Sequence, residues 1–471
     1  MSKLKDKIAS TLLDQLFFEG ICSVSLVGSF CDKDDLTVIS DIDTIVICED
    51  LTSEIFRKCL SVCQTLEGKD LGFPGRKVYV NSTFGPLKFD CGENIVIHLM
   101  IYDLASHREH VNKSPFTCFD WERSPIYRGK SLTQIYPVMK LQYSDFKVSR
   151  RGINNYIRDL SNGVISYREY DFSDGAVKEV QKQQYLNARH KAEYAYHIIK
   201  NLVCNYIKMM IDDNALIVGD ELEKYWRTFL PETAEFIPLF RELENFKNKR
   251  CNETPETPIQ IVKNFIISFE GELDRRWQEG SRIDLIRHQR TSLNDGSFLG
   301  QGRDPGILNF PQQQLDHDYD VIYSSPLKRA LQSSQSLCPE QRIITDKSLC
   351  EINYGNAEGL TFQELTSQYP EIVESWESGE DPRFPKGENS DDVLQRVMDF
   401  IRTLSSKDHL LVTHNVVIRC ILGQILGIEI KKWHLIEIPH LEVFSVQSLD
   451  NTLTPNLETQ QRIRIRDGIS G

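Results

Sequence analysis

The chain has 471 residues, of which 40% are hydrophobic, so it is long enough for two or three domains with full cores. Its formal net charge of −13 disfavours a protein that coats nucleic acid. The first residues lack the apolar core of a signal peptide, and no stretch is long enough to span a membrane. We therefore expect a cytoplasmic protein with no membrane partner.

The first chemically informative segment is an apolar strand, Ser23–Val27, that runs into Gly28 and Ser29. After a polar loop, a second strand begins in which Asp41 and Asp43 alternate with apolar residues and therefore share one face. Two carboxylates held so closely repel each other unless a divalent cation lies between them, and Mg²⁺ prefers such oxygen ligands. Gly28 lets the backbone approach a triphosphate, and the Ser29 hydroxyl can bond one of its oxygens. This pattern predicts a magnesium and nucleotide site.

A Gly-Ser pair followed about a dozen residues later by Asp-x-Asp resembles the polymerase-β-like nucleotidyltransferase superfamily. The resemblance covers about residues 15–105 and implies a mixed-sheet fold in which Asp41 and Asp43 hold metal ions. It also implies a third carboxylate on a later strand, which helps to activate the attacking group. Two residues compete for that position. Asp90 is our choice as the third metal ligand, and His98, on the apolar run 95–101, is the alternative.

The middle of the chain predicts a helical region. Apolar residues from Ala192 to Met210 recur at three- and four-residue steps, which is typical of an amphipathic helix. The nucleotidyltransferase resemblance implies that a helical domain closes the nucleotide cleft, so Lys191, or Arg189 beside it, is a candidate ligand of the triphosphate. Gly280 and Ser281 mark the next boundary. We expect a catalytic domain over 1–145, a helical domain and linker over 146–279, and a third domain over 280–471.

Two apolar runs in the last third of the chain each end in a histidine. Asp284–Arg287 leads to His288, and Leu410–Thr413 leads to His414. Both runs predict buried parallel strands, whose carboxyl ends are where open α/β sheets place their ligands. Two imidazoles at such ends can converge on one substrate atom, with the guanidinium of Arg287 beside them. The pattern predicts a phosphate pocket that contains a nucleophile.

Two further residue types complete this chemistry. Ser325 is a predicted helix N-cap, with Pro326 at the first helical position and Arg329 in the first turn, where a guanidinium can bind two phosphate oxygens. Glu351 lies in a turn-rich stretch that can hold a protonated carboxyl near a leaving oxygen. Phosphoryl transfer to imidazole needs a neutral histidine, cations on the equatorial oxygens and an acid for the departing alkoxide.

Several ordered motifs from about Ser281 onward resemble the histidine phosphatase superfamily, which is also called phosphoglycerate-mutase-like. The matching segments are Leu285-Ile286-Arg287-His288, Ser324-Ser325-Pro326 with Arg329, Glu351 ahead of Glu358-Gly359, and Thr413-His414 with Arg419. The resemblance implies a three-layer α/β/α fold that needs no metal, with His288 as the phosphorylated nucleophile and Glu351 as the proton donor. It implies that Arg287, Arg329 and His414 bind the phosphoryl group. Gln289 and Asn415 stand where glycine is common in the family, next to the pocket.

Together these patterns predict a multidomain α/β protein that is a bifunctional enzyme. We expect metal-dependent transfer of a nucleoside monophosphate from a nucleoside triphosphate to a small phosphorylated metabolite, and phosphomonoester hydrolysis through a phosphohistidine. One alternative is an enzyme that modifies RNA ends or proteins, although the net charge does not favour a nucleic-acid partner. Another is a histidine phosphatase regulated by a non-catalytic nucleotide-binding domain.

Overall fold

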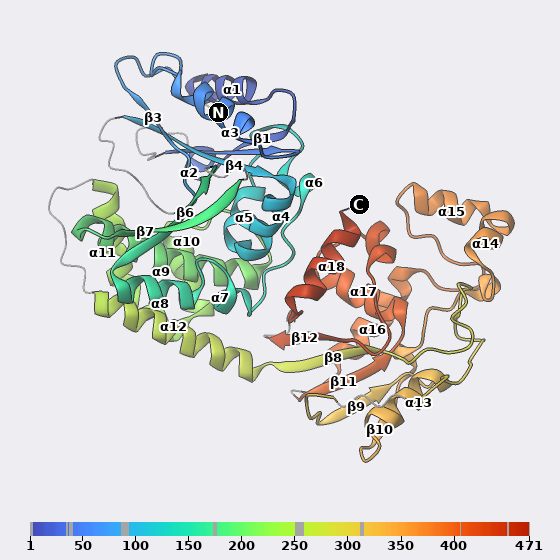
Figure 1. Ribbon diagram of the computed structural model, residues 1–471. Helices are drawn as coiled ribbons and strands as arrows, with labels where there is room; N and C mark the ends of the chain where they lie inside the picture. The colour runs from blue at the N-terminus through green and yellow to red at the C-terminus, as the bar shows by residue number, and fades with distance from the viewer. Residues whose placement is uncertain are drawn as a thin grey trace. The chain divides into compact units, whose positions relative to one another are not determined.

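The computed structural model describes residues 3–33, 36, 41–85, 94–172, 177–249, 259–310, 315–405, 407–449 and 452–470 (Figure 1). The chain forms two compact units, a first unit over Met1–Leu273 and a second over Asp274–Ile469. The division falls inside a helix, a few residues before the predicted boundary at 280. The predicted separation of residues 1–145 from 146–279 stays a prediction.

The first unit is built on a five-stranded mixed sheet with the strand order β3-β4-β2-β1-β5. Strand β2 runs parallel to β4 and antiparallel to β1, and this register places Asp43 beside both His98 and Val27. The strands are β1 (Ile21–Val27), β2 (Ile42–Cys48), β3 (Val78–Asn81), β4 (Ile95–Asp103) and β5 (Tyr127–Gly129). Segments far apart in the sequence therefore bring their polar residues to one place on the sheet.

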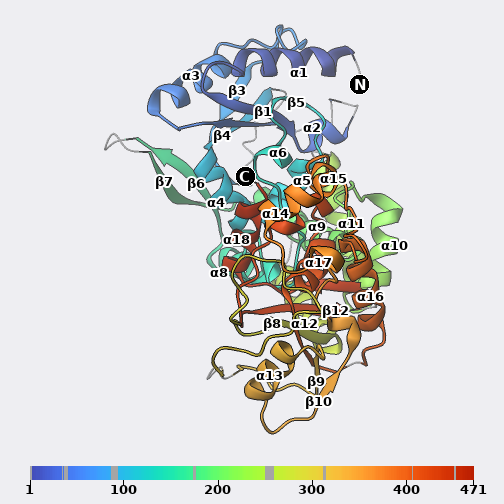
Figure 2. The same cartoon turned by 90° about the vertical axis from the view of Figure 1, so that its right-hand side faces the viewer.

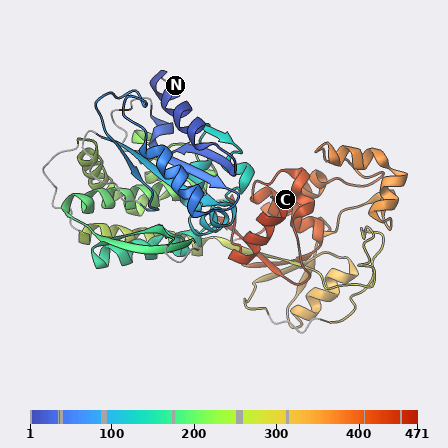
Figure 3. The same ribbon diagram turned by 45° about the horizontal axis from the view of Figure 1, so that its top comes forward.

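Helices cover both faces of this sheet. Alternate residues of β1, β2 and β4 pack with α1 (Lys3–Leu16) and α3 (Ser53–Gln64) on one face. The intervening residues pack with α4 (Leu104–Lys113) and α5 (Pro115–Glu122) on the other. Figure 1 and Figure 3 show α1 and α3 together on one side. The period of two along the strands thus divides the apolar side chains between two cores.

The rest of the first unit has a large helical core around α9 (Ala188–Ile211), as the sequence predicts for this segment. Trp226, Phe265 and Phe269 are buried in that core. The other helices of this unit are α2 (Ser29–Asp32), α6 (Leu132–Ile135), α7 (Asp145–Val148), α8 (Ile153–Asn162), α10 (Gly219–Phe229), η2 (Pro231–Phe236), α11 (Ile237–Lys249) and α12 (Ile259–Glu279).

The middle region is mostly helical, as the sequence predicts, but it also contains one hairpin that the sequence analysis did not predict. Strands β6 (Val164–Asp171) and β7 (Lys178–Tyr185) form an antiparallel pair that is separate from the larger sheet (Figure 2). All of β7 is exposed or half-buried, so its sequence carries no apolar alternation that would mark a strand.

The second unit contains a six-stranded mixed sheet with the order β10-β9-β11-β8-β12-β13. The first four strands in this order run parallel, and β12 and β13 join antiparallel at one side. The strands are β8 (Ser281–Arg287), β9 (Val321–Ser324), β10 (Ile343–Thr345), β11 (His409–Thr413), β12 (Val443–Leu449) and β13 (Thr452–Pro455). β8 and β11 confirm the two strands predicted to end at the histidines.

Helices lie on both sides of this second sheet, with α13 on one side and α16, α17 and α18 on the other (Figure 1). Ala330 and Leu337 of α13 pack against apolar residues of β8, β9 and β11. The helical segments are α13 (Lys328–Leu337), η3 (Lys347–Leu349), η4 (Gly355–Ala357), α14 (Phe362–Gln368), α15 (Pro370–Glu377), α16 (Ser390–Arg402), α17 (Asn415–Ile425), η5 (Ile430–Leu435) and α18 (Thr459–Ile469). Across the described ranges, none of the helices has the length and apolar character needed to cross a membrane.

Candidate functional site

In the second unit, the two strand-end histidines converge. β8 and β11 are parallel neighbours, and Thr413 pairs with Arg287, so the residues that follow them emerge side by side. The ring centroids of His288 and His414 are 5.1 Å apart, and both side chains are buried. The structure therefore brings together the two imidazoles that the sequence pattern pairs.

The hydrogen bonds of His288 determine which ring nitrogen is available for chemistry. Nδ1 lies 2.7 Å from the backbone oxygen of Gln289, which can only accept, so Nδ1 carries the proton. Nε2 accepts a hydrogen bond of 3.2 Å from Nε of Arg329. Burial, followed by the positive charge of Arg329, holds the pKa of His288 well below its usual range. The ring is thus neutral, with the lone pair of Nε2 on the side of the Arg329 guanidinium.

Arg329 is fully buried, and its guanidinium is held by backbone oxygens. Nη2 donates to Gly300 over 2.9 Å, and Nη1 donates to Arg303 over 3.2 Å. The predicted N-cap at Ser325 is wrong: α13 begins at Lys328 after an extended Leu327. Ser325 instead places its hydroxyl 2.8 Å from Nε2 of His414, and Arg329 still lies in the first turn of the helix.

Two buried nitrogen atoms of the cluster have no hydrogen-bond partner among the described residues, Nε of Arg287 and Nδ1 of His414. Arg287 is anchored by a hydrogen bond of 2.8 Å from Nη1 to the backbone oxygen of Ile438. A buried donor without an acceptor costs free energy, and an anionic oxygen would satisfy it. These atoms, with Arg329, suit the oxygens of a phosphoryl group.

Glu351 is the candidate acid of this cluster. Burial raises the pKa of its carboxyl above the ordinary value, although the charges of Arg329 and Arg287 oppose that shift. Oε1 accepts hydrogen bonds from the backbone nitrogens of Ile352 and Val416, at 3.0 and 3.2 Å. A carboxyl that is buried and has a raised pKa can keep its proton near neutral pH and donate it to a leaving oxygen.

The sequence analysis missed three residues that support this cluster. Nδ1 of His440 lies 2.5 Å from the backbone oxygen of His288, and Arg396 and Gln301 both donate to the backbone oxygen of Glu351. These side chains contact backbone oxygens, and such contacts depend on how the chain folds. No pattern of residues in the sequence predicts them.

The buried neutral histidines predict a pH dependence of stability. The folded-state pKa values of His288 and His414 lie below the ordinary value of about 6.5, because burial disfavours the charged ring. Below that pH the unfolded chain binds protons that the folded chain does not. The free energy of unfolding is therefore highest above about pH 6.5 and falls as the pH is lowered. Each histidine contributes a slope of up to about 1.4 kcal/mol per pH unit. Denaturant unfolding of the protein and of His414→Asn between about pH 7 and pH 5 checks this, and equal slopes would contradict it.

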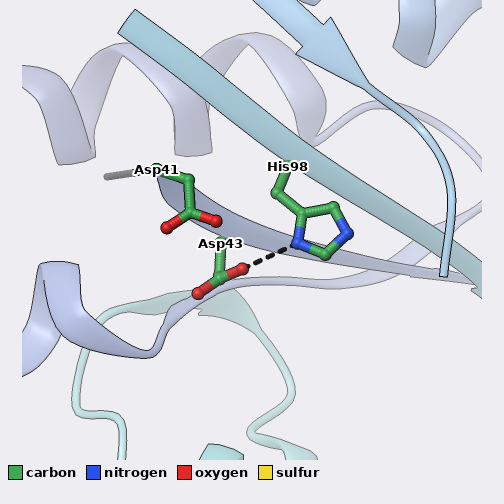
Figure 4. Close-up of side chains that lie close together, drawn as sticks. All are labelled: Asp41, Asp43 and His98. Atoms are coloured by element: carbon green, nitrogen blue, oxygen red, sulfur yellow. Dashed lines mark hydrogen bonds and ion pairs between the residues drawn. The ribbon is translucent and has the colours of Figure 1, made fainter. Parts of the chain in front are cut away.

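In the first unit, Asp41, Asp43 and His98 form a second cluster (Figure 4). One ligand atom from each lies within 4.8 Å of the others. Nδ1 of His98 is 2.8 Å from Oδ1 of Asp43, and Nε2 is 2.7 Å from the backbone oxygen of Thr83. Burial lowers the pKa of His98, but the hydrogen bond and charge of Asp43 outweigh it and raise the pKa. Two carboxylates and an imidazole fit a divalent cation.

The other residues predicted for this site have different outcomes. Gly28 has a φ of 68°, and a Cβ atom built there would lie 2.3 Å from Oδ2 of Asp43, so a glycine is required. Ser29 begins α2 directly after it. Lys191 lies on α9 and does not line the cavity described below. Of the two candidates for the third metal position, the structure places His98 beside the aspartates, and Asp90 lies outside the described residues.

A cavity of about 460 Å³ in the first unit includes this cluster in its wall. Four arginines also line the cavity: Arg150, Arg151, Arg158 and Arg168. Arg150 and Arg168 both pair with the same carboxylate, Glu179, at 3.2 and 2.5 Å. The sequence analysis missed them because they come from a loop, a helix and an exposed hairpin, with no common spacing. The cavity thus combines a cluster that could hold a metal ion with a wall of guanidinium groups.

Nearby, His110 is stacked on Tyr102, with ring centroids 5.0 Å apart. Its Nδ1 lies 3.4 Å from Nη2 of Arg168, which can only donate, so Nε2 carries the proton. Among the described residues, that Nε2 is buried without a partner. Burial, then the charge of Arg168, holds the pKa of His110 well below its usual range. This ring adds a further donor beside the arginines.

Comparisons with known proteins bear on the second unit. A model of the histidine phosphatase superfamily (branch 1) matches residues 283–454. Phosphoserine phosphatase 1 of Hydrogenobacter thermophilus is 29% identical over 168 residues, which is 32% of this chain and 79% of that protein. The 6-phosphofructo-2-kinase/fructose-2,6-bisphosphatase of Aquarana catesbeiana is 31% identical over 159 residues, which is 31% of this chain and 32% of that protein. This chain therefore spans about a third of the length of that second relative.

A solved structure of a phosphoserine phosphatase from Entamoeba histolytica covers 38% of this chain and 98% of its own, at 24% identity and a TM-score of 0.34. The family match covers β8 to β13 and therefore His288, Arg329, Glu351 and His414. These residues suit histidine-phosphatase-type hydrolysis of phosphomonoesters. Residues 283–454 are a histidine phosphatase domain of branch 1 of that superfamily.

Proposed function

We propose that the protein is a bifunctional enzyme. Its first unit transfers a nucleoside monophosphate from a nucleoside triphosphate to a small phosphorylated acceptor, and its second unit hydrolyses a phosphomonoester through a phosphohistidine. The observation that carries the first activity is the cavity that has Asp41, Asp43 and His98 in one wall and four arginines in the rest of its lining.

The carboxylates of this cavity have a role in nucleotide binding. Asp41 and Asp43 would hold a divalent cation, and that cation would neutralise the charge of the triphosphate and of the leaving pyrophosphate. Gly28 leaves room for the Asp43 carboxylate, since any side chain there would occupy the same space. The backbone at Gly28 therefore lies directly beside the Asp43 carboxylate.

The arginines favour an acceptor that carries its own phosphate. Arg150 and Arg168 share one carboxylate, so their pairing with Glu179 leaves a net positive charge. The unpartnered Nε2–H of His110 adds a neutral donor in the same region. A guanidinium pair with a spare donor binds a phosphate or carboxylate better than it binds an uncharged alcohol.

The mechanism in the second unit follows from the hydrogen bonds of its cluster. Nε2 of His288 attacks phosphorus while Arg287, Arg329 and His414 bind the equatorial oxygens. The bond from phosphorus to the ester oxygen breaks, and Glu351 transfers its proton to the departing alkoxide. The Glu351 carboxylate then takes a proton from water, whose oxygen attacks phosphorus and releases inorganic phosphate and neutral His288.

One observation favours a second candidate function, in which the first unit binds a nucleotide and regulates the phosphatase without transfer. Among the described residues, the imidazole of His98 is the group that lies beside Asp41 and Asp43, and Asp90 is outside those residues. The family that the sequence resembles has there a carboxylate that helps to activate the acceptor. An imidazole tied to Asp43 and to Thr83 is less suited to that role.

A product analysis separates the two functions. The full chain is incubated with each nucleoside triphosphate, a divalent cation and a panel of sugar phosphates and phosphorylated alcohols, followed by pyrophosphate assay and mass spectrometry. We expect pyrophosphate together with an acceptor whose mass has increased by one nucleoside monophosphate. A regulatory unit would bind the nucleotide, release no pyrophosphate with any acceptor, and change the rate of phosphatase turnover, which is measured in parallel with a chelator present.

A further inference from the structure

We propose that Asp41, Asp43 and His98 form a mixed oxygen and nitrogen site that selects a first-row transition cation of the Mn²⁺ type over Mg²⁺, with Nδ1 of His98 as a direct ligand. This departs from the magnesium site that the two aspartates alone predict. The inference deepens the proposed function, because it names the cation of that site, but metal binding does not require that transfer occurs.

The Thr83 carbonyl sets the tautomer of His98. A backbone oxygen can only accept a hydrogen bond, so the ring nitrogen 2.7 Å from it, Nε2, must carry a proton. Nδ1 is then the nitrogen that faces the aspartates, and a cation bound there would displace the proton that Nδ1 donates to Asp43. Histidines that bind metals commonly donate their other N–H to a backbone carbonyl in this way, which orients the ring and makes the ligating nitrogen more basic.

The carbonyl that sets this tautomer is itself fixed in place. The side-chain oxygen of Asn81 accepts hydrogen bonds from the backbone nitrogen of Thr83, at 3.1 Å, and from its hydroxyl, at 2.8 Å. Asn81 is the last residue of β3 and pairs with His98 in the parallel register of β3 and β4. The ring of His98 is therefore oriented by the backbone of the sheet.

The positions of the three side chains suit neighbouring ligands of one ion. Asp43 and His98 are register partners on β2 and β4, and Asp41 precedes Asp43 by two residues on the same face. Nδ1 of His98 and Oδ1 of Asp43 are 2.8 Å apart. Adjacent ligands of an octahedral ion with bonds of about 2.1 Å are separated by about 3.0 Å. A small shift therefore admits a cation between these atoms.

The donor atoms decide the choice of metal. Mg²⁺ takes oxygen ligands and water, and it gains little from an imidazole. Mn²⁺ accepts carboxylate oxygens and also imidazole nitrogen, and later first-row cations bind nitrogen more strongly still. Only 7% of His98 is exposed, so water does not readily replace it as a ligand.

The test uses electron paramagnetic resonance of Mn²⁺ bound to the chelator-stripped full chain, without any nucleotide. We expect a pulsed spectrum with coupling to a directly bound ¹⁴N nucleus, which is absent in His98→Gln and in His98→Asp. His98→Asp restores an all-oxygen site, so the ratio of the Mg²⁺ to the Mn²⁺ dissociation constant should fall by about 10-fold or more. His190→Gln, on α9, is the matched control and should keep the coupling.

Two results would overturn the inference. In the first, the parent chain binds Mn²⁺ and Asp43→Asn does not, but the spectrum of the parent chain shows no ¹⁴N coupling. The other is an unchanged ratio of the two dissociation constants in His98→Asp. Circular dichroism of each variant shows whether its fold is intact, and His98→Gln reports nitrogen ligation if His98→Asp does not fold. Since the spectrum reports binding alone, a chain that binds Mn²⁺ through nitrogen but releases no pyrophosphate would contradict the transferase proposal and leave this inference standing.

Discussion

His288→Ala is expected to abolish the phosphatase activity of the purified chain, with kcat on an aryl phosphate lowered on the order of 10³-fold or more. The variant removes Nε2, the nitrogen atom on which the phosphoryl group would be carried. His414 is close, but its Nε2 faces the Ser325 hydroxyl at 2.8 Å. Initial rates with a chelator present provide the measurement.

Two further variants show that the loss is specific. His434 is exposed on η5, so His434→Ala should turn over at the rate of the parent chain. Glu351→Gln should slow the hydrolysis of alkyl phosphates much more than that of aryl phosphates, because only a poor leaving group needs the proton of Glu351. Turnover of His288→Ala at the parent rate would disprove the phosphohistidine mechanism.

Asp43→Asn is expected to stop pyrophosphate release by the first unit, with a decrease of about 100-fold or more at a fixed concentration of divalent cation. The Asp43 carboxylate has two roles at this site, because it would bind the cation and it also accepts the hydrogen bond of His98. Asparagine keeps the shape of the side chain but removes the charge that would hold the metal. The assay is pyrophosphate release with the acceptor found in the product analysis.

Phosphatase turnover gives the internal control for Asp43→Asn, since Asp43 belongs to the first unit and the rate should not change. Asp50→Asn is a matched control, because Asp50 is an exposed aspartate two residues beyond the end of β2. Pyrophosphate release by Asp43→Asn at the rate of the parent chain would rule out the metal site as the site of transfer.

The parts of the fold that sequence predicts are those in which burial leaves a continuous run or a regular spacing of apolar residues. β8 and β11 are apolar runs buried almost throughout, and the histidines at their ends follow from the strands. β2 and β4 are similarly buried, so Asp43 and His98 stand out as polar positions in apolar strands. Where a strand has two apolar faces, the composition of the segment alone predicts it.

The parts that the sequence did not predict lack such an apolar pattern. The hairpin β6–β7 carries Arg168 and Glu179, and a loop carries Arg150, so their meeting in one cavity depends on tertiary structure alone. His440 contacts the backbone of His288 from a segment far along the chain. The N-cap prediction at Ser325 is wrong because α13 begins three residues later, and the Ser325 hydroxyl instead contacts His414 and accepts from the backbone nitrogen of Leu327.

The position of Gly28 has a consequence for how the proposed metal site would be lost in evolution. Because a Cβ atom there would occupy the space of the Asp43 carboxylate, Gly28→Ala removes room from the site without removing a ligand. A descendant of this chain with that one change would still contain Asp41, Asp43 and His98. A survey that looked only for the Asp-x-Asp pair would classify such a descendant as a transferase. A survey that also required the glycine would classify it as inactive.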